Sequence, residues 1–437
     1  MKAAISRRVT PMITSPGLRT TRRKLHAAAR RLRGRQPTVH YFHQADDPYS
    51  HLAAQTLEAL VERYRIDLRC HLVPAPEDSA APERVRLEAW SRRDAQNLAG
   101  RLGLDWPGES VALSSALAPG ATHRANAALA AAVGNADFPK IAVRIGAALW
   151  RGNMDALVVP GAVDAVTVER ILRAGAALRA ARGHYLGATF YFEGEWYWGV
   201  DRLHYLEARL RDAGLAHSPG GDFIAPVKDV ELTARPTAAV TPQLHFFFSF
   251  RSPYVCISVP RVRRLAAHYG ADLRLRFILP MVMRGLPVPR AKSRYIVLDA
   301  KREAERVEAP FGCIVDPVGR ATERGIAVLN HAMRDGRGPD FVEYFLRGVW
   351  AEGIDATTDT GLNRIAERAD IDAGAVAAAL QDDSWREAAE ANRQELFEMG
   401  LWGAPTLRVD DGPGHWGQDR LWVIEEDLIA ATSAERR

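Results

Sequence analysis

Hydrophobic and polar residues alternate with two different periods along the chain, and the order of these periods predicts the elements of each half. A period of two indicates half-buried strands, whereas leucines and alanines spaced three or four residues apart indicate helices. The first half predicts a strand at 38–42, a helix at 49–64, a strand at 66–72, a helical block at about 83–182, a hairpin at 189–198 and a helix at about 201–212. The second half repeats this order with a strand at 244–250, a helix from 252 to about 269, a strand at 273–277, a helical block at about 290–399, strands at 403–409 and 415–416, and a last helix that opens at 418.

Short matches between the two halves support an internal repeat. They occur in one order, at offsets between 200 and 218 residues: Asp47-Pro-Tyr49 with Ser252-Pro-Tyr254, Asp94-Ala95 with Asp299-Ala300, Ala121-Thr-His-Arg124 with Ala321-Thr-Glu-Arg324, Trp150 with Trp350, and Trp198-Gly-Val-Asp-Arg-Leu203 with Trp416-Gly-Gln-Asp-Arg-Leu421. Each match is weak by itself, but five in the same order predict a duplicated fold.

The element order also predicts the architecture. Two strands joined by one helix require a right-handed parallel crossover, and the later hairpin adds antiparallel strands. We therefore predict an α/β protein with two tandem thioredoxin-like domains, at 37–216 and 242–437, each with a helical insertion. Residues 217–241 are rich in Pro, Gly, Ser, Thr and Ala, and we expect them to form the linker.

Positive charge is concentrated in a basic N-terminal tail, residues 1–36, which carries eleven Lys or Arg and no Asp or Glu. The whole chain has a net charge of +5, but the part after residue 36 carries 47 basic and 53 acidic residues, a net charge of −6. A nucleic-acid-binding face would place its charge on the folded domains, so we expect no nucleic-acid partner. Our first expectation is that the tail is solvated. A short basic helix packed on a neighbour and a weak anchor for acidic surfaces stay open as alternatives.

Three cysteines, Cys70, Cys256 and Cys313, are too few and too scattered for a disulfide framework or a zinc site, and we expect no bound metal. Such sparse cysteines are typical of a reducing compartment, and we expect a cytoplasmic protein. The chain contains no run of 18 apolar residues, so we predict no membrane span.

The most informative stretch is 244–254, which predicts a buried strand, a turn and a helix that begins at Ser252-Pro253. At a helix N-terminus, unpaired N–H groups and the helix dipole favour an anion, and a hydroxyl there is a candidate reactive group. Ser252 is equally a plain N-cap with proline at the first helical position. Both roles remain open from the residues alone.

Four motifs in the second half resemble one protein family in their order and spacing. They are Phe248-Ser-Phe-Arg-Ser-Pro-Tyr254, Pro289-Arg-Ala-Lys-Ser-Arg-Tyr295, Gly403-Ala-Pro-Thr406 and Trp416-Gly-Gln-Asp-Arg420. They resemble the DsbA-like family of 2-hydroxychromene-2-carboxylate isomerases and kappa-class glutathione transferases, well over 243–432 and loosely over 38–212. The resemblance implies a DsbA-type fold, glutathione as cofactor, and dimers. In this chain the two halves would form an intramolecular pseudo-dimer, and a homo-oligomer stays open.

The resemblance assigns roles to the start of the helix and to the loop after Gly403. Ser252 would donate a hydrogen bond to a glutathione thiolate, as the catalytic residue. Ala404 and Pro405 would form a cis-proline loop in which Ala404 pairs with the cysteinyl backbone of glutathione, with an ordinary trans proline as the alternative. Val255 stands where redox relatives keep a second cysteine, so dithiol chemistry is not expected. Cys256 is expected to be buried and inert.

Three more residues would contact glutathione if the resemblance holds. Gln418 and Asp419 would contact its γ-glutamyl group at the start of the last helix, and Lys292 would pair with a carboxylate. The alternatives are that Asp419 only caps the helix and that Lys292 is solvated. The chain departs from relatives, which often carry Asn before this lysine, by having Arg284 in that loop, and Arg284 is a substitute anion partner.

The first half has lost most of these residues. Asp47 replaces the serine, 187–189 lacks the proline, Leu87 replaces the lysine, and Val200 replaces the glutamine. A carboxylate at position 47 would repel a thiolate, so helix capping is its expected role. A metal site that combines it with the nearby histidines is the weaker alternative; these are His40, His43 and His51.

We therefore expect a glutathione-dependent isomerase or transferase that acts on a small electrophilic substrate, with aromatic catabolism as the leading context. The weak candidates for the substrate pocket are Tyr254, Met281, Met283, Tyr295, Phe311 and Trp402, which are just as consistent with plain core. Two alternatives remain: a non-catalytic binding or scaffold protein, and, less favoured because the paired cysteines are absent, a thiol-disulfide oxidoreductase.

Overall fold

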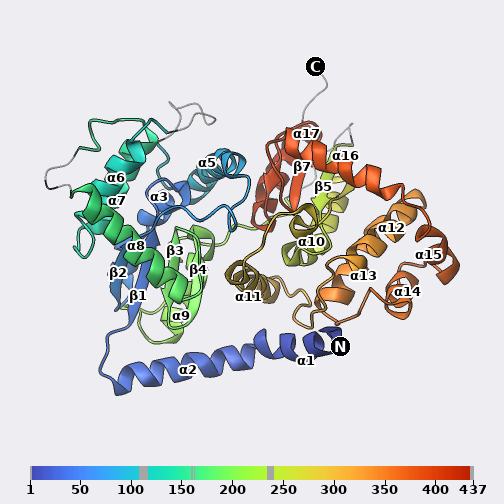
Figure 1. The fold of residues 1–437 in the computed structure, drawn as a ribbon, viewed down its shortest axis with the longest axis horizontal. Helices are drawn as coiled ribbons and strands as arrows, with labels where there is room; N and C mark the ends of the chain where they lie inside the picture. The colour runs from blue at the N-terminus through green and yellow to red at the C-terminus, as the bar shows by residue number, and fades with distance from the viewer. Residues whose placement is uncertain (1, 108–116, 159–160, 162, 234–240, 434–437) are drawn as a thin grey trace. The chain divides into compact units, whose positions relative to one another are not determined.

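The computed structural model describes the 437-residue chain except for residues 1, 108–116, 159–160, 162, 234–240 and 434–437 (Figure 1). It contains two compact units. The N-terminal unit comprises Thr20–Lys228 and Pro289–Lys292, and the C-terminal unit comprises Met1–Arg19, Asp229–Val288 and Ser293–Arg437. The division between Lys228 and Asp229 falls inside the predicted linker.

A four-stranded sheet forms the centre of the N-terminal unit, in the order β2-β1-β3-β4. Its strands are β1 (Thr38–His43), β2 (Asp67–Leu72), β3 (Thr189–Phe192) and β4 (Glu195–Trp198). β1 and β2 are parallel, whereas β3 is antiparallel to both β1 and β4. The helices around it are α3 (Pro48–Ala54), α4 (Leu57–Arg63), α5 (Arg84–Leu102), α6 (Ala121–Ala130), α7 (Phe138–Trp150), α8 (Ala165–Ala181) and α9 (Leu203–Asp212), with η2 (Val200–Arg202) before α9.

The C-terminal unit has a sheet of the same topology, in the order β6-β5-β7-β8. Its strands are β5 (Gln243–Phe248), β6 (Asp272–Phe277), β7 (Thr406–Val409) and β8 (His415–Trp416), with the parallel pair again first. Its helices are α10 (Pro253–Tyr269), α11 (Arg290–Arg306), α12 (Arg320–Arg334), α13 (Gly338–Trp350), α14 (Asp359–Glu367), α15 (Ala373–Ala379), α16 (Trp385–Glu398) and α17 (Leu421–Ser433), with η3 (Met281–Arg284) and η4 (Gln418–Arg420). The predicted fold class is confirmed: two α/β domains, each with helices inserted between its parallel and antiparallel strand pairs.

The central strand of each sheet contributes large apolar side chains to the core of its unit. Val39 and Tyr41 of β1 are fully buried with Leu52, Leu60 and other residues of the flanking helices. Leu244 and Phe246 of β5 hold the equivalent places in the second core. Burial of one strand face against amphipathic helices is the main contribution to the stability of each domain.

One predicted helix is wrong in detail, because 49–64 forms two helices, α3 and α4. The break lies at Gln55 and Thr56, where the buried Thr56 hydroxyl donates a 2.7 Å hydrogen bond to the carbonyl oxygen of Ala53. A threonine hydroxyl competes with the helix for backbone carbonyls and so favours a local interruption. The equivalent helix of the second domain, α10, is continuous.

The expectation of a solvated N-terminal tail is also wrong, because the described tail folds into α1 (Lys2–Ile13) and α2 (Pro16–Leu32). Within the C-terminal unit, Arg19 pairs with Glu305 at 2.6 Å. Within the N-terminal unit, Arg23 pairs with Glu195 and Arg30 with Glu193, both at 2.7 Å. The acidic partners lie more than 160 residues away in the sequence, so the local charge run gave no sign of them. No described helix is long and apolar enough to cross a membrane.

Candidate functional site

Ser252 is the N-cap of α10 in the C-terminal unit. Its backbone is extended, with φ −94° and ψ 116°, and Pro253 occupies the first helical turn. The Ser252 Oγ accepts a 3.3 Å hydrogen bond from the backbone N–H of Val255. The cap predicted from the sequence is therefore present, and it leaves the half-buried hydroxyl at the helix start, where the backbone N–H of Cys256 donates to the carbonyl oxygen of Ser252.

The loop before β7 lies against this hydroxyl. The peptide bond between Ala404 and Pro405 is cis, which confirms the conformation expected from the sequence. The Ser252 Oγ donates a 3.1 Å hydrogen bond to the carbonyl oxygen of Ala404. A hydroxyl has one proton, so Ser252 can donate to a ligand only if this proton leaves the Ala404 carbonyl.

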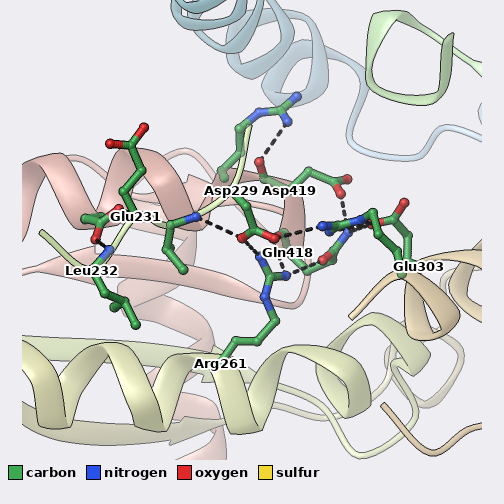
Figure 2. Close-up of polar contacts among 11 residues, drawn as sticks. Asp229, Glu231, Leu232, Arg261, Glu303, Gln418 and Asp419 are labelled. Carbon is green, nitrogen blue, oxygen red and sulfur yellow. Dashed lines mark hydrogen bonds and ion pairs between the residues drawn. The ribbon is translucent and has the colours of Figure 1, made fainter. Parts of the chain in front are cut away.

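Gln418 and Asp419 lie in η4, at the start of the last helix, as predicted, but the Gln418 side chain is engaged with the protein itself. Gln418 is 1% exposed. Its Oε1 accepts a 2.8 Å hydrogen bond from Arg261 Nη1, and its Nε2 donates at 2.9 Å to Glu303 (Figure 2). The same amide nitrogen donates to the carboxylate of Asp419. Gln418 therefore orients the half-buried Asp419.

Asp229, in the middle of the predicted linker, completes this network. Arg261 donates to one Asp229 carboxylate oxygen (Figure 2). Arg306 donates to the other at 2.8 Å. Burial raises the pKa of Asp229, but Arg261 and Arg306 outweigh it and hold the pKa below its ordinary value. The sequence gave no signal for this residue, because it stands in a segment that looks like a flexible connection.

The next linker residues are fixed by a second carboxylate. The backbone N–H groups of Glu231 and Leu232, which Figure 2 labels, lie in this segment. Each donates a 2.6 Å hydrogen bond to Glu425 of α17. The hydroxyl of Tyr269 donates to the same carboxylate at 2.9 Å. Glu425 is 5% exposed, so these contacts satisfy a buried charge. We call residues 229–232 the linker clasp.

Lys292 falls in a different unit from Ser252. It belongs to the N-terminal unit, where its Nζ donates a 2.8 Å hydrogen bond to the carbonyl oxygen of Ala80. Burial lowers the pKa of Lys292 to about 8. Arg284, the candidate substitute anion partner, donates through Nη2 to the carbonyl oxygen of Trp402 at 2.9 Å.

The residues proposed for the substrate pocket have mixed surroundings. Trp402 is 1% exposed and packs on Trp416 with 4.8 Å between ring centroids. Tyr295 and Phe311 are also buried, whereas Met281 and Met283 of η3 are half-buried. The hydroxyl of Tyr254 donates to Asp299 at 2.9 Å. Trp402, Tyr295 and Phe311 thus belong largely to the core, and a substrate role remains a prediction.

The corresponding helix start in the N-terminal unit has a different polar group. The Asp47 carboxylate accepts hydrogen bonds from the backbone N–H groups of Tyr49 and Ser50, and from the Ser50 hydroxyl at 2.7 Å. Ser50, at the position of Val255, also accepts from the backbone N–H of Ala188 at 2.9 Å. Burial raises the pKa of Asp47 to about 6, although these hydrogen bonds oppose the rise. The expected capping role is confirmed. Sequence reasoning missed Ser50.

The thiols and histidines do not add a reactive centre to either site. Cys256 is buried as expected, and burial raises the pKa of its thiol to about 12. His43 and His51 are buried, and burial lowers the pKa of His43 to about 3 and of His51 to about 4. Among the residues that the structure describes, no three His, Cys, Asp or Glu side chains are grouped to hold a metal ion.

Comparisons with known proteins agree with this geometry for the C-terminal unit. A family profile described as the DSBA-like thioredoxin domain matches residues 243–428. The 2-hydroxychromene-2-carboxylate isomerase of Sphingobium xenophagum is 25% identical over 198 residues, covering 44% of this chain and 100% of the relative. The enzyme of the same name from Pseudomonas sp. (strain C18) is 26% identical over 194 residues, covering 43% of this chain and 90% of the relative.

Two solved structures are similar to part of this chain. The structure of a 2-hydroxychromene-2-carboxylate isomerase covers 43% of this chain and 95% of its own, with a TM-score of 0.37 and 22% identity. A probable DsbA oxidoreductase from Streptomyces coelicolor covers 45% of this chain and 93% of its own, with a TM-score of 0.37 and 17% identity. The C-terminal half of the protein, residues 243–428, is a DsbA-like thioredoxin domain whose sequence relatives are named 2-hydroxychromene-2-carboxylate isomerases.

Proposed function

We propose that the C-terminal domain is a glutathione-dependent isomerase or transferase for a small electrophilic substrate. One observation carries this proposal: Ser252 places a hydroxyl at the start of α10, between the backbone N–H of Val255 and the carbonyl of Ala404. Glutathione would supply a thiolate nucleophile. Ser252 would give it a hydrogen-bond donor at the positive end of a helix, which favours the anionic form.

The residues around Ser252 fit glutathione only in part. Asp419 is a half-buried carboxylate fixed by the Gln418 amide, which suits recognition of an ammonium group. Gln418 already uses its amide for Asp419, Glu303 and Arg261, so its role would be to position Asp419 rather than to contact the ligand. Lys292 hydrogen-bonds within the N-terminal unit and adds nothing to this fit.

Thiol–disulfide exchange is the less favoured activity. Its two cysteine positions hold Ser252 and Val255, and the neighbouring Cys256 is buried with a pKa raised to about 12. A thiol with such a pKa is almost entirely protonated at neutral pH and is a poor nucleophile. A non-catalytic binding protein is the second candidate, and the full engagement of Gln418 within the protein favours it.

Calorimetric titration of the full-length protein with glutathione separates these candidates. We expect binding in the micromolar to millimolar range, together with a lowered pKa of the bound thiol, measured from thiolate absorbance. Ser252→Ala should abolish the lowering of the thiol pKa. Thr358→Ala is the matched control, because Thr358 is also an N-cap that accepts from the backbone N–H of Gly361 at 3.0 Å, on the exposed start of α14. No binding at millimolar glutathione would contradict the proposal.

The activity test uses 2-hydroxychromene-2-carboxylate, the compound in the names of the relatives. We expect isomerisation that requires glutathione and is lost in Ser252→Ala. Glutathione binding without any turnover of this compound, or of a simple aryl halide in a conjugation assay, would favour the binding protein instead.

A further inference from the structure

Helix α2 is held against the N-terminal unit by its charged side. Arg23 and Arg30, seven residues and about two turns apart, pair with the two glutamates on either side of Gly194, at the turn between β3 and β4. His26 lies on the same side of the helix, because a Cβ at Gly194 would meet its Nε2 at 3.0 Å. These contacts fix which side of α2 faces the N-terminal unit.

The opposite side of α2 carries its exposed leucines. Each residue of an α-helix is turned about 100° from the one before it, so Leu25 and Leu32 point about 160° away from Arg23 and Arg30, two residues earlier. Leu25 is 64% exposed and Leu32 is 89% exposed. Helices of globular proteins normally bury their apolar side and expose their charged side. In α2 this arrangement is reversed.

Four basic side chains border the two leucines, on both flanks of the stripe that the leucines form. Lys24 and Arg31 lie on one flank, and Arg22 and Arg33 lie on the other. All four are exposed. Within the part of the chain that the structure describes, they take no part in the ion pairs of α2, which three half-buried arginines make. We call these four cations, together with the two leucines, the outer face of α2.

The end of the helix explains only part of this basic character. The backbone N–H of Arg35 donates to the carbonyl oxygen of Arg30 at 3.1 Å, and Gly34, just before Arg35, is left-handed with φ 59°. Cations near such a C-terminal end stabilise a helix through its dipole, which accounts for Arg31 and Arg33. This effect falls off beyond the last turn. It therefore accounts neither for the two cations near the middle of α2 nor for the exposed leucines.

A second copy of α2 is a poor occupant of the outer face. Two such helices packed side by side would bring cations against cations, because residues 1–36 carry no Asp or Glu. Two leucines on a helix of 17 residues also fall short of the roughly three or four heptads that indicate a coiled coil. The surface of an anionic bilayer fits both features, because leucines enter the acyl boundary while Lys and Arg side chains reach the headgroups.

We propose that the outer face of α2 binds the surface of an anionic lipid bilayer, with the helix lying in the plane of the interface. Each Lys or Arg near such a surface strengthens binding about fivefold, because the negative headgroups attract it. The part of the chain after residue 36 has a net charge of −6, so the attraction acts through the basic tail. This interaction is independent of the Ser252 chemistry.

Sedimentation of the full-length protein with large unilamellar vesicles tests the proposal. One set of vesicles consists of phosphatidylcholine, and the other contains equal parts of phosphatidylcholine and the anionic lipid phosphatidylglycerol. We expect binding to the anionic vesicles and binding at least about tenfold weaker to the neutral ones. Raising the ionic strength from about 0.1 M to about 1 M shortens the screening length from about 10 Å to about 3 Å and should release the protein.

The contribution of the leucines is measured with the double variant Leu25→Ala/Leu32→Ala, which keeps a good helix former at both positions. Binding to the anionic vesicles should weaken at least about tenfold, because the apolar part of the interaction is lost. The matched control is Val85→Ala/Val166→Ala, since these valines of α5 and α8 are 82% and 77% exposed. The control should bind as the wild-type protein does.

The contribution of charge is measured with Lys24→Gln/Arg31→Gln. Loss of these two cations should weaken binding about 25-fold, as two factors of about five. Arg170→Gln/Arg173→Gln makes the same change of charge at exposed positions of α8 and is the control. The melting temperatures of all four double variants check that each is folded.

The proposal is overturned if the wild-type protein does not bind the anionic vesicles, if it binds the neutral vesicles equally well, or if the two variants of α2 bind as tightly as their controls. One further result also overturns it and assigns the outer face to a second copy of the chain. This result is the absence of vesicle binding together with a dimer, measured by light scattering, that Leu25→Ala/Leu32→Ala converts to a monomer.

Discussion

Helices α10 and α3 begin at equivalent places in two units whose sheets have the same topology. Their N-caps, however, carry different polar groups. In the C-terminal unit, Ser252 caps the helix with a neutral hydroxyl that shares its proton with the carbonyl of Ala404. In the N-terminal unit, Asp47 caps the helix with a half-buried carboxylate that receives three hydrogen bonds. A cap is needed at both places, but only the neutral cap leaves the positive helix end open to an anion.

The largest expected effect concerns Ser252. If the hydroxyl stabilises a thiolate, Ser252→Ala should lower the rate of the glutathione-dependent reaction about 100-fold or more, as removal of one well-placed donor does in other enzymes. Steady-state kinetics of the full-length protein measure this effect. Asp47→Asn, the matched change at the other helix start, should leave the rate unchanged, and an equal loss in both variants would contradict the contrast between the two caps.

Asp47 should instead control stability as a function of pH. Its pKa in the folded protein, raised to about 6 by burial, lies above the ordinary value of 3.8. The folded state therefore holds the proton more tightly than the unfolded state, and stability should fall as the pH rises from about 4 to about 6. The difference corresponds to about 3 kcal/mol.

Urea unfolding at several pH values measures this dependence. Asp47→Asn keeps a capping side chain without the titration, so its free energy of unfolding should lack this fall. If the free energy of unfolding of the wild-type protein rises over the same pH range, the hydrogen bonds to the Asp47 carboxylate outweigh its burial.

The linker clasp should contribute a smaller amount to stability. Asp229→Ala removes the carboxylate that Arg261 and Arg306 share, and we expect a loss of about 1–2 kcal/mol in the free energy of unfolding, reduced by partial exposure of the pair. Because Arg261 also holds Gln418, glutathione affinity should fall as well. Asp222→Ala, at an exposed position in the same linker, is the control. Equal stability of both variants would show that the clasp is incidental.

The smallest expected effect concerns α2. Arg30 and Glu193 are each 14% exposed in their side chains and pair at 2.7 Å, so Arg30→Ala should lower the free energy of unfolding by about 1 kcal/mol. Arg31→Ala changes an exposed neighbour with the same helix propensity and should have almost no effect. Chemical denaturation of the two variants side by side gives the comparison. If the two variants are equally stable, the Arg30–Glu193 ion pair adds nothing measurable to the free energy of unfolding.

Much of the fold followed from the sequence because its determinants are local. A strand pattern at 38–42 marked β1, a buried strand pattern at 244–250 marked β5, and the position of Ser252 before Pro253 marked the start of α10. The cis bond before Pro405 followed from a family motif rather than from any physical pattern. The division of 49–64 into two helices was missed because it depends on the hydroxyl of Thr56, whose burial the local pattern does not reveal.

The sequence alone determined the two α/β domains, the order of their elements along the chain and the caps at Ser252 and Asp47, since these depend on periodicity and on contacts within a few residues. Only the tertiary structure decided that Gln418 is held by Arg261, 157 residues away, that Lys292 contacts Ala80, and that the linker closes on Glu425. Long side chains such as Arg and Lys reach many alternative partners, and which partner they find depends on the packing of distant segments. The chemistry of the Ser252 site therefore depends on contacts between residues that are far apart in the sequence.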